Sequence, residues 1–228
     1  GRYYTGNRCE KGIGGAPSCT SENNIYQYKY ERVFDYKPRE HAPRGRIGIP
    51  RVLNLYEDYP FWFTLFTKLG FEVVLSAQSS AAMYCEGMST IPSDSLCYPA
   101  KLTHGHIMDL IEKGVKTIFY PCIPYNMDDD NIKVDNRYNC PVVASYPENI
   151  RGNMDLLKEK HVTFIQPFLP IARPKALSAR LRHELKLKGI RVSKRAVNKA
   201  VISAYAELER YKHDVLSKGH EIIQNAKA

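Results

Sequence analysis

From residue 46 onward, short apolar runs alternate with longer segments in which apolar residues recur at helical spacing. RIGIPRVLN and FEVVLS are short apolar runs, and each predicts a strand. Between them, EDYPFWFTLFTKLG predicts a helix that starts near Pro60 and ends at Gly70, with one apolar side formed by Phe61, Leu65 and Leu69. This order of strand, helix and strand predicts a parallel βαβ unit with a right-handed crossover.

The same alternation continues towards residue 170. PAKLTHGHIMDLIEKG predicts a helix begun by Pro99 and closed by Gly114, and VKTIFYP predicts a strand covered on both faces. CPVVASYP extends the series of apolar runs, followed by the helix-like ENIRGNMDLLKEK and by HVTFIQPFLP. We therefore expect an α/β fold with a mainly parallel, Rossmann- or flavodoxin-like sheet of about five strands and helices on both faces.

The two ends of the chain have different patterns from this central part. Residues 1–45 are rich in Gly, Tyr and charge without a sustained period, so we expect an irregular N-terminal arm. The α/β domain is expected over residues 46–190, and it includes the helical KALSARLRHELKLKG. Residues 191–228 are expected to form a long C-terminal helical segment with a narrow apolar seam. The chain opens without methionine, and we interpret it as a fragment of a larger protein.

Charge and hydropathy narrow the class of partner. The formal net charge is +9, and much of the excess lies after residue 170, where cations alternate with apolar residues at helical spacing. No aromatic residues accompany them in a stacking pattern, so nucleic acid is a disfavoured partner, while a CoA ester or an acidic partner domain fits as well. No stretch has the length of a membrane span and no signal peptide is evident, so we expect a cytoplasmic location without a membrane partner.

The six cysteines are the main candidates for chemistry, and a chain of this size without a secretion signal favours free thiols or ligands over disulfides. Cys97 lies two residues before Pro99, which places it at or next to the N-cap of a helix. The positive end of the helix dipole favours the thiolate there. Lys101 and His104 follow at successive turns and could add positive potential.

Two further cysteines are expected at the same edge of the sheet. Cys122 follows the strand-like TIFYP, and Cys140 precedes the apolar run of CPVV. Ligands collect outside the carboxyl ends of strands in such folds. Three thiols that converge there would repel one another as thiolates unless a metal held them, so a three-cysteine metal site is one hypothesis. The alternative is that each cysteine is a small buried hydrophobe.

Other candidates are weaker on the pattern alone. A catalytic pair of Cys97 with His104 or His106 is disfavoured by their separation of seven or nine residues around one helix. Cys85 is expected to serve packing. Asp128, Asp129 and Asp130 are expected to be solvated, with a divalent-cation site as the alternative. Cys9 and Cys19 are expected to be unpaired thiols, with a second metal site or a disulfide as the alternative. Gly12, Gly14 and Gly15 do not follow a strand and form no phosphate-binding pattern.

Several blocks resemble one family over nearly the whole chain. GNRCEKG, RIGIPRVLNLYEDYPFW, TIPSDSLCYPAKLTHGHIMDLIEKGVKTIFYPC and CPVVASYPENI are similar to the uncharacterised domain of large acyl-CoA dehydratase activase-related proteins, the putative activators of 2-hydroxyacyl-CoA dehydratases. The arrangement is distantly similar to the dehydratase subunits themselves, in which three cysteines hold a [4Fe–4S] cluster.

The resemblance implies an iron–sulfur-binding electron-transfer or reductase domain in anaerobic metabolism. Its implied metal ligands are Cys97, Cys122 and Cys140, and the implied surrounding residues are Lys101, His104, Ser93 and Asp94. The implied partners are other domains of the same polypeptide, including an ATP-dependent activase module, and an acyl-CoA or a dehydratase. The chain itself shows no nucleotide-phosphate loop, so we do not expect it to hydrolyse ATP alone. The alternative function is a docking domain without a cluster.

Overall fold

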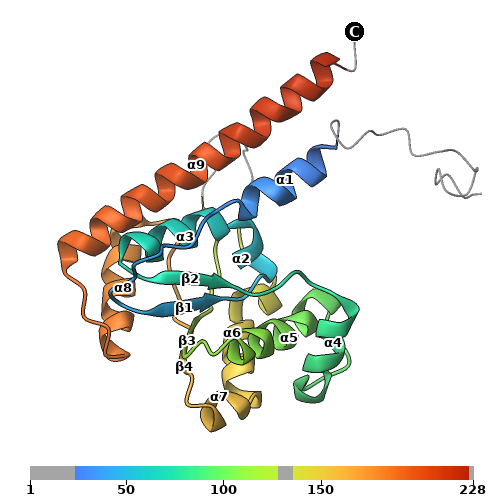
Figure 1. The fold of residues 1–228 in the computed structure, drawn as a ribbon, viewed down its shortest axis with the longest axis vertical. Coiled ribbons are helices and arrows are strands. Elements are labelled where there is room, and N and C mark those ends of the chain that lie inside the picture. The colour runs from blue at the N-terminus through green and yellow to red at the C-terminus, as the bar shows by residue number, and fades with distance from the viewer. Residues whose placement is uncertain (1–23, 128–135, 226–228) are drawn as a thin grey trace, which may run out of the picture. The chain divides into compact units, whose positions relative to one another are not determined.

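The computed structural model describes residues 24–127 and 136–225. They form an α/β structure with a parallel sheet (Figure 1). Its elements are α1 (Ile25–Phe34), β1 (Arg46–Ile49), α2 (Leu53–Glu57), α3 (Tyr59–Lys68), β2 (Glu72–Leu75), α4 (Ala81–Gly87), η3 (Met88–Thr90), α5 (Tyr98–Glu112), β3 (Thr117–Phe119), α6 (Pro141–Asn153), α7 (Leu156–Glu159), β4 (Thr163–Ile165), α8 (Pro174–Leu187) and α9 (Lys194–Asn225). The expected long C-terminal helix is α9.

The described residues fall into two compact units, and α9 contributes to both. The smaller unit contains α1 and the part of α9 from Arg210 onward. The helix α1 lies within residues 1–45, where we expected only irregular structure. Its local cause is Asn24, whose side chain accepts hydrogen bonds from the N–H groups of Tyr26 and Gln27 and so caps the helix. Arg32 of this helix forms an ion pair with Asp214 at 2.8 Å.

The larger unit, Tyr36–Glu209, contains the sheet in the order β2-β1-β3-β4. All pairs are parallel, with Ile47 opposite Val73 and Ile118 opposite Phe164. The parallel α/β class is therefore confirmed. The described residues contain four strands in this sheet, and the expected total of five is not found among them. From β1 the chain continues to β2 on one side, and from β3 it continues to β4 on the other side. The adjacent strands β1 and β3 therefore form a topological switch point.

The run CPVVASYP begins helix α6 instead of forming a strand. Its buried residues, Tyr146, Pro147 and Ile150, follow the spacing of one helical side, and the two valines are only half-buried. Pro141 occupies the first turn, where its missing N–H costs nothing, and Cys140 caps the helix. These local features outweigh the strand preference of the two valines.

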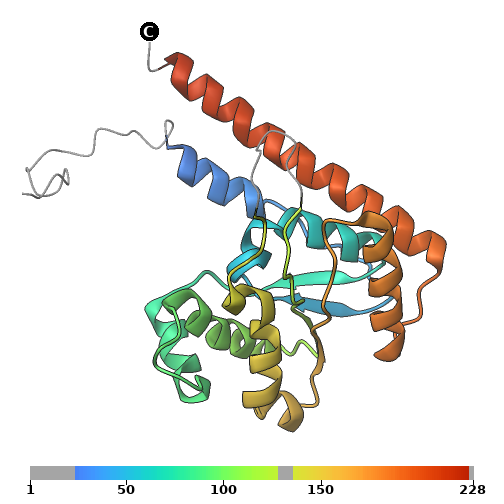
Figure 2. The same cartoon turned by 180° about the vertical axis from the view of Figure 1, so that it is seen from behind.

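Helices cover both faces of the sheet, as expected (Figures 1 and 2). On one face, Trp62 and Phe66 of α3 are fully buried and pack on Phe119 of β3, with ring centroids 5.0 and 4.7 Å apart. On the other face, a Cβ at Gly48 of β1 would lie 3.1 Å from the Leu110 side chain of α5. None of the helices in the described ranges is long and apolar enough to span a membrane.

Four helices end in the same way, with a residue in the left-handed region just after the last turn. Gly70, Gly114 and Gly189 have φ angles of 93°, 72° and 78°, which glycine adopts without a steric penalty. After α7 the equivalent residue is His161, with φ of 51°. There the N–H of Val162 bonds to the carbonyl of Leu157, as in a Schellman motif.

Substituting His161 by Gly is expected to raise the free energy of unfolding by about 0.5–1 kcal/mol, because it removes the steric cost of a left-handed side chain. Urea denaturation of the wild type and the variant measures this difference. His183→Gly, at an exposed position inside α8, is the matched control and is expected to lower stability by about 0.5 kcal/mol. A loss of stability in His161→Gly would contradict the assignment of strain to this position.

Candidate functional site

The carboxyl ends of β1 and β3 define the edge of the sheet where a ligand is most expected. Two unusual features follow β1. Leu53 has a φ angle of 46°, in a region that residues with a Cβ rarely occupy. The side-chain amide of Asn54 is buried without a hydrogen-bond partner among the described residues. Strain and unpaired polar atoms of this kind gather at functional sites, so this edge carries the candidate site.

Cys97 is the N-cap residue of α5, as the sequence predicts. Its backbone carbonyl accepts hydrogen bonds from Ala100 and Lys101, both at 3.1 Å, while its side chain caps nothing and is exposed. Burial raises the pKa of Tyr146 to about 12, and the nearby Cys97 adds to this increase as a smaller cause. Cys97 thus offers an accessible thiol beside a buried phenol.

Cys122 lies three residues after β3 and is buried. Its N–H bonds to the carbonyl of Pro167 at 2.9 Å, and its carbonyl accepts the N–H of Leu169, so it extends the pairing between the ends of β3 and β4. Burial raises the pKa of the Cys122 thiol to about 12. The negative charge of Glu148 adds to this increase, while a hydrogen bond from the Glu148 backbone N–H opposes it. A thiol in this setting stays protonated at neutral pH unless a cation replaces the proton.

Cys140 is the N-cap residue of α6. Its sulfur accepts a hydrogen bond from the N–H of Val143 at 3.4 Å, and the side chain is otherwise exposed. Cys97 and Cys140 are therefore the N-cap residues of two neighbouring helices, each with a proline in the first turn, but only the Cys140 side chain caps its helix.

The structure brings these three cysteines to the same edge without gathering them into a ligand group. Within residues 24–127 and 136–225, no three His, Cys, Asp or Glu side chains lie close enough to hold a metal ion. Cys97 and Cys122 do share one neighbour, Tyr120. Burial raises the pKa of Tyr120, and both cysteines add to that increase. The hydroxyl of Tyr120 in turn lies beside that of Thr103 on α5.

The remaining residues implied by the resemblance lie around the start of α5. Lys101 is half-buried in the first turn. Ser93 and Asp94 are exposed in the preceding turn, where the Ser93 hydroxyl bonds to that of Ser95 at 2.8 Å. Within the described residues, no hydrogen bond or ion pair joins these three side chains to a cysteine, so their roles stay predictions.

His104 points into the protein, where both ring nitrogens are hydrogen-bonded. Nδ1 lies 2.7 Å from the hydroxyl of Thr90, and Nε2 lies 2.8 Å from the hydroxyl of Tyr146. Thr90 already donates its proton to the carbonyl of Gly87, so it must accept from Nδ1–H. Nε2 is then the acceptor of the Tyr146 proton. Burial lowers the pKa of His104 to about 4, which keeps this neutral tautomer.

His106 lies on another side of α5 and belongs to a second buried cluster. Its Nδ1 is 2.8 Å from the hydroxyl of Ser76, and its Nε2 is 2.9 Å from that of Ser79. The Ser76 hydroxyl also accepts the N–H of Arg51, which joins the ends of β1 and β2. Burial is the main reason that the pKa of His106 falls to about 4. Neither histidine is placed as a base for Cys97, and both instead fix α5 to its neighbours.

Two glycines let α4 and α5 cross with their backbones in contact. A Cβ at Gly105 would lie 2.0 Å from the carbonyl oxygen of Met83, and one at Gly87 would lie 2.4 Å from the backbone nitrogen of Gly105. Sequence reasoning missed this crossing and the His106 cluster. The spacing H-G-H was the available signal, because two histidines flanking a glycine inside an apolar helix both need buried partners.

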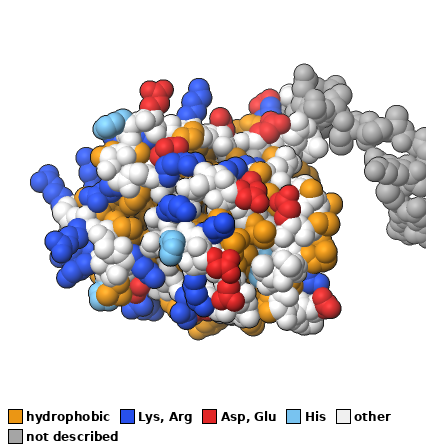
Figure 3. All heavy atoms as spheres, turned by 60° about the horizontal axis from the view of Figure 1, so that its bottom comes forward, with side chains coloured by type: hydrophobic (Ala, Val, Ile, Leu, Met, Phe, Trp, Pro, Cys, Tyr) orange, Lys and Arg blue, Asp and Glu red, His pale blue; other side chains and the backbone are white. Residues whose placement is uncertain are grey.

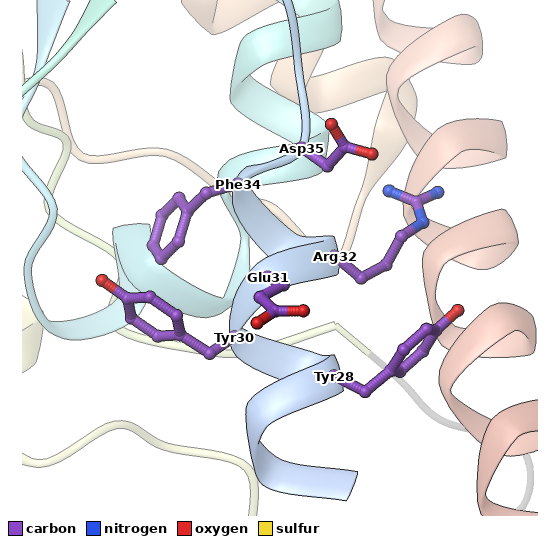
Figure 4. Close-up of a pocket in the computed structure, with 6 residues that line it drawn as sticks. All are labelled: Tyr28, Tyr30, Glu31, Arg32, Phe34 and Asp35. Carbon is purple, nitrogen blue, oxygen red and sulfur yellow. The ribbon is translucent and has the colours of Figure 1, made fainter. Parts of the chain in front are cut away.

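Three other expectations have different outcomes. Cys85 is exposed on α4, so the expectation that it packs in the core is wrong. The acidic run and the glycines and cysteines of the arm lie outside the described residues: Asp128, Asp129, Asp130, Cys9, Cys19, Gly12, Gly14 and Gly15. A separate pocket in the smaller unit is lined by residues of α1 and Asp35, and none of the predicted site residues contributes to it (Figure 4).

Comparison with known proteins identifies one family. The model of the family described as the CoA enzyme activase uncharacterised domain matches residues 46–228. No curated protein and no solved structure matches the chain.

Proposed function

Since this chain belongs to the CoA enzyme activase uncharacterised domain family, we propose that it is an iron–sulfur-binding electron-transfer domain of a 2-hydroxyacyl-CoA dehydratase activator-like protein. In this proposal Cys97, Cys122 and Cys140 hold a [4Fe–4S] cluster. The observation that carries it is the position of the three thiols: two are N-caps of helices that start at the carboxyl edge of the sheet, and the third follows β3.

The donor set suits this type of cofactor in its chemistry. Iron–sulfur clusters are held by thiolates, and three thiolates leave one iron open. Cys140 already accepts a helix-terminal N–H at its sulfur, from Val143, and the N-cap position of Cys97 places its thiol near the positive end of the α5 dipole. Because the three side chains do not form a compact ligand group among the described residues, binding must itself gather them.

A bound [4Fe–4S] cluster would supply one-electron transfer, with a potential set by hydrogen bonds and burial. The chain's own residues would have separate tasks. Cys122 must release its proton on binding, because burial otherwise keeps its thiol protonated. The buried ring of Tyr120 excludes water from one side, and Lys101 adds a cation in the first turn of α5.

Anaerobic reconstitution with iron and sulfide tests this proposal. The wild type is expected to bind about four irons per chain and to gain the visible absorption of a cluster. Cys97→Ala, Cys122→Ala and Cys140→Ala should each reduce iron binding severalfold. Cys85→Ala is the matched control, because Cys85 is an exposed cysteine on α4 that the proposal does not use, and it should bind iron as the wild type does.

The alternative is a docking domain in which the thiols hold no cluster. It is favoured by the different settings of the cysteines, since Cys97 and Cys140 are exposed while Cys122 is buried. Iron uptake that is absent from the wild type, or that persists equally in Cys97→Ala, would select this alternative over the electron-transfer role.

A further inference from the structure

The net charge of the chain is concentrated in one short stretch. Residues 173–199 contain ten Lys and Arg and one Glu, which gives a formal charge of +9, equal to that of the whole chain. The other 201 residues contain 23 basic and 23 acidic side chains and are neutral overall. A basic balance spread evenly would need no explanation, whereas this concentration defines one surface of the protein.

The stretch forms a continuous surface of α8, the turn that follows it, and the first turns of α9. All ten basic residues are exposed. Arg180 pairs with Glu184 at 2.8 Å, which uses the only carboxylate that the stretch contains. The Arg182 Nε bonds to the carbonyl of Val192 at 3.3 Å and thereby ties α8 to the turn. Figure 3 shows Lys and Arg side chains gathered along the side on which α8 lies in Figure 1.

Three of these cations lie where they work against the local stability of the two helices. Lys175 lies in the first turn of α8, and Lys194 and Arg195 lie in the first turn of α9. Neither first turn contains an acidic residue. The positive end of a helix dipole prefers carboxylates and disfavours cations. An anionic partner would offset this unfavourable arrangement, which local folding does not explain.

The chemistry of the surface favours one kind of anion. The helix α8 is about 21 Å long, which exceeds the reach of a single phosphate group. Residues 173–199 contain no Phe, Tyr or Trp on which a nucleobase could stack. Instead, Leu187 is 66% exposed among the cations, and Ile202 is 69% exposed one turn after Lys199. Protein–protein interfaces combine an apolar centre with a polar rim, and two exposed apolar side chains bordered by cations fit that arrangement.

We propose that α8 and the first turns of α9, residues 173–202, form a docking surface for the acidic face of another protein domain. The cations of this basic surface steer and orient the partner, and Leu187 and Ile202 contact its apolar residues. The inference does not depend on the cysteines, because none of them lies in this surface.

Fluorescence anisotropy with the full chain tests the proposal. The main probe is a synthetic helical peptide of about 20 residues, long enough to span α8, with Glu on most of its surface and one leucine stripe. Duplex DNA of similar length and vesicles rich in phosphatidylserine are the competing probes. The peptide is expected to bind, and to bind more weakly as salt screens the charges.

A triple charge reversal separates binding from folding. Lys175→Glu with Lys194→Glu and Arg195→Glu should weaken peptide binding by about tenfold or more. The same substitutions place acids in the first turns of α8 and α9, so the unfolding temperature should stay equal or rise. The matched control reverses Lys37, Lys68 and Lys160, which are exposed elsewhere in the larger unit, and should change peptide binding less than about twofold.

Leu187→Gln distinguishes a protein partner from other polyanions. It should weaken peptide binding by about threefold or more and leave any DNA binding unchanged, because only the peptide uses the apolar contact. Preferential binding of DNA or of the vesicles would overturn the proposal, and so would an equal loss of peptide binding in both triple variants.

Discussion

Substituting Gly105 by Ala is expected to lower the free energy of unfolding by about 3 kcal/mol or more. The added Cβ would lie 2.0 Å from the carbonyl oxygen of Met83, far inside the contact distance of two atoms. The obstacle is the backbone of α4 and cannot rotate away as a side chain could. The helices would have to separate, which would also disturb the hydrogen bonds of the neighbouring His104 and His106.

Urea denaturation measures this loss, and Gly219→Ala provides the matched control. Gly219 is also inside a helix, but a Cβ there would meet nothing within 4 Å. Alanine at that position should raise stability by about 0.5–1 kcal/mol, because it is the better helix former. A loss below about 1 kcal/mol in Gly105→Ala would mean that α4 and α5 do not cross in backbone contact.

Acidification from pH 7.5 to pH 5 is expected to remove about 4 kcal/mol of stability through His104 and His106 alone. Burial lowers both pKa values from 6.5 to about 4. Between those values the unfolded chain binds a proton at each histidine and the folded chain does not, so stability falls as the pH falls through 6.5 and levels off near 4. At pH 5 each histidine accounts for about 2 kcal/mol.

The groups around each ring support this direction. Arg51 and Lys113 oppose a charge on His106 and Asp109 favours it, but all three effects are smaller than that of burial. For His104 the cause is burial against α6, where its partner is the neutral hydroxyl of Tyr146.

The contribution of the two histidines is separated from that of the carboxylates by a double variant, His104→Gln/His106→Gln. The free energy of unfolding is measured for the wild type and the variant at both pH values. The double variant should lose about 4 kcal/mol less than the wild type on acidification, whatever its stability at neutral pH. His106→Gln alone should recover about half of that difference. An equal loss in wild type and variants would show that the histidines titrate normally in the folded protein.

Much of the fold follows from local signals in the sequence. Gly70 and Gly114 mark the ends of α3 and α5 because only glycine reaches a positive φ without strain, and Pro99 marks the start of α5. The segment after Cys140 was mistaken for a strand because two valines suggested one, although Pro141 is equally characteristic of a first helical turn. Helix α1 was missed because its apolar side is weak and its capping residue, Asn24, is common in turns as well.

The site was predictable only in its outline. The N-cap position of Cys97 depends on its neighbours in the chain, so the sequence contained it. The partners of His104 and His106 depend on which helices and strands meet, and Tyr146 is 42 residues away from His104 in the chain. Single-sequence patterns carry no such information, and the same holds for the contact between Gly87 and Gly105.

The strand order has a kinetic consequence. Neighbours β1 and β3 pair through Gly48 and Ile118, and about seventy residues separate these two positions. The crossing of α4 and α5 lies inside that interval and needs only a short loop to close. Once formed, this crossing shortens the length of chain that remains open between β1 and β3. The centre of the sheet therefore depends on two glycines that contribute no side chain to it, and they influence how fast the protein folds as well as how stable it is.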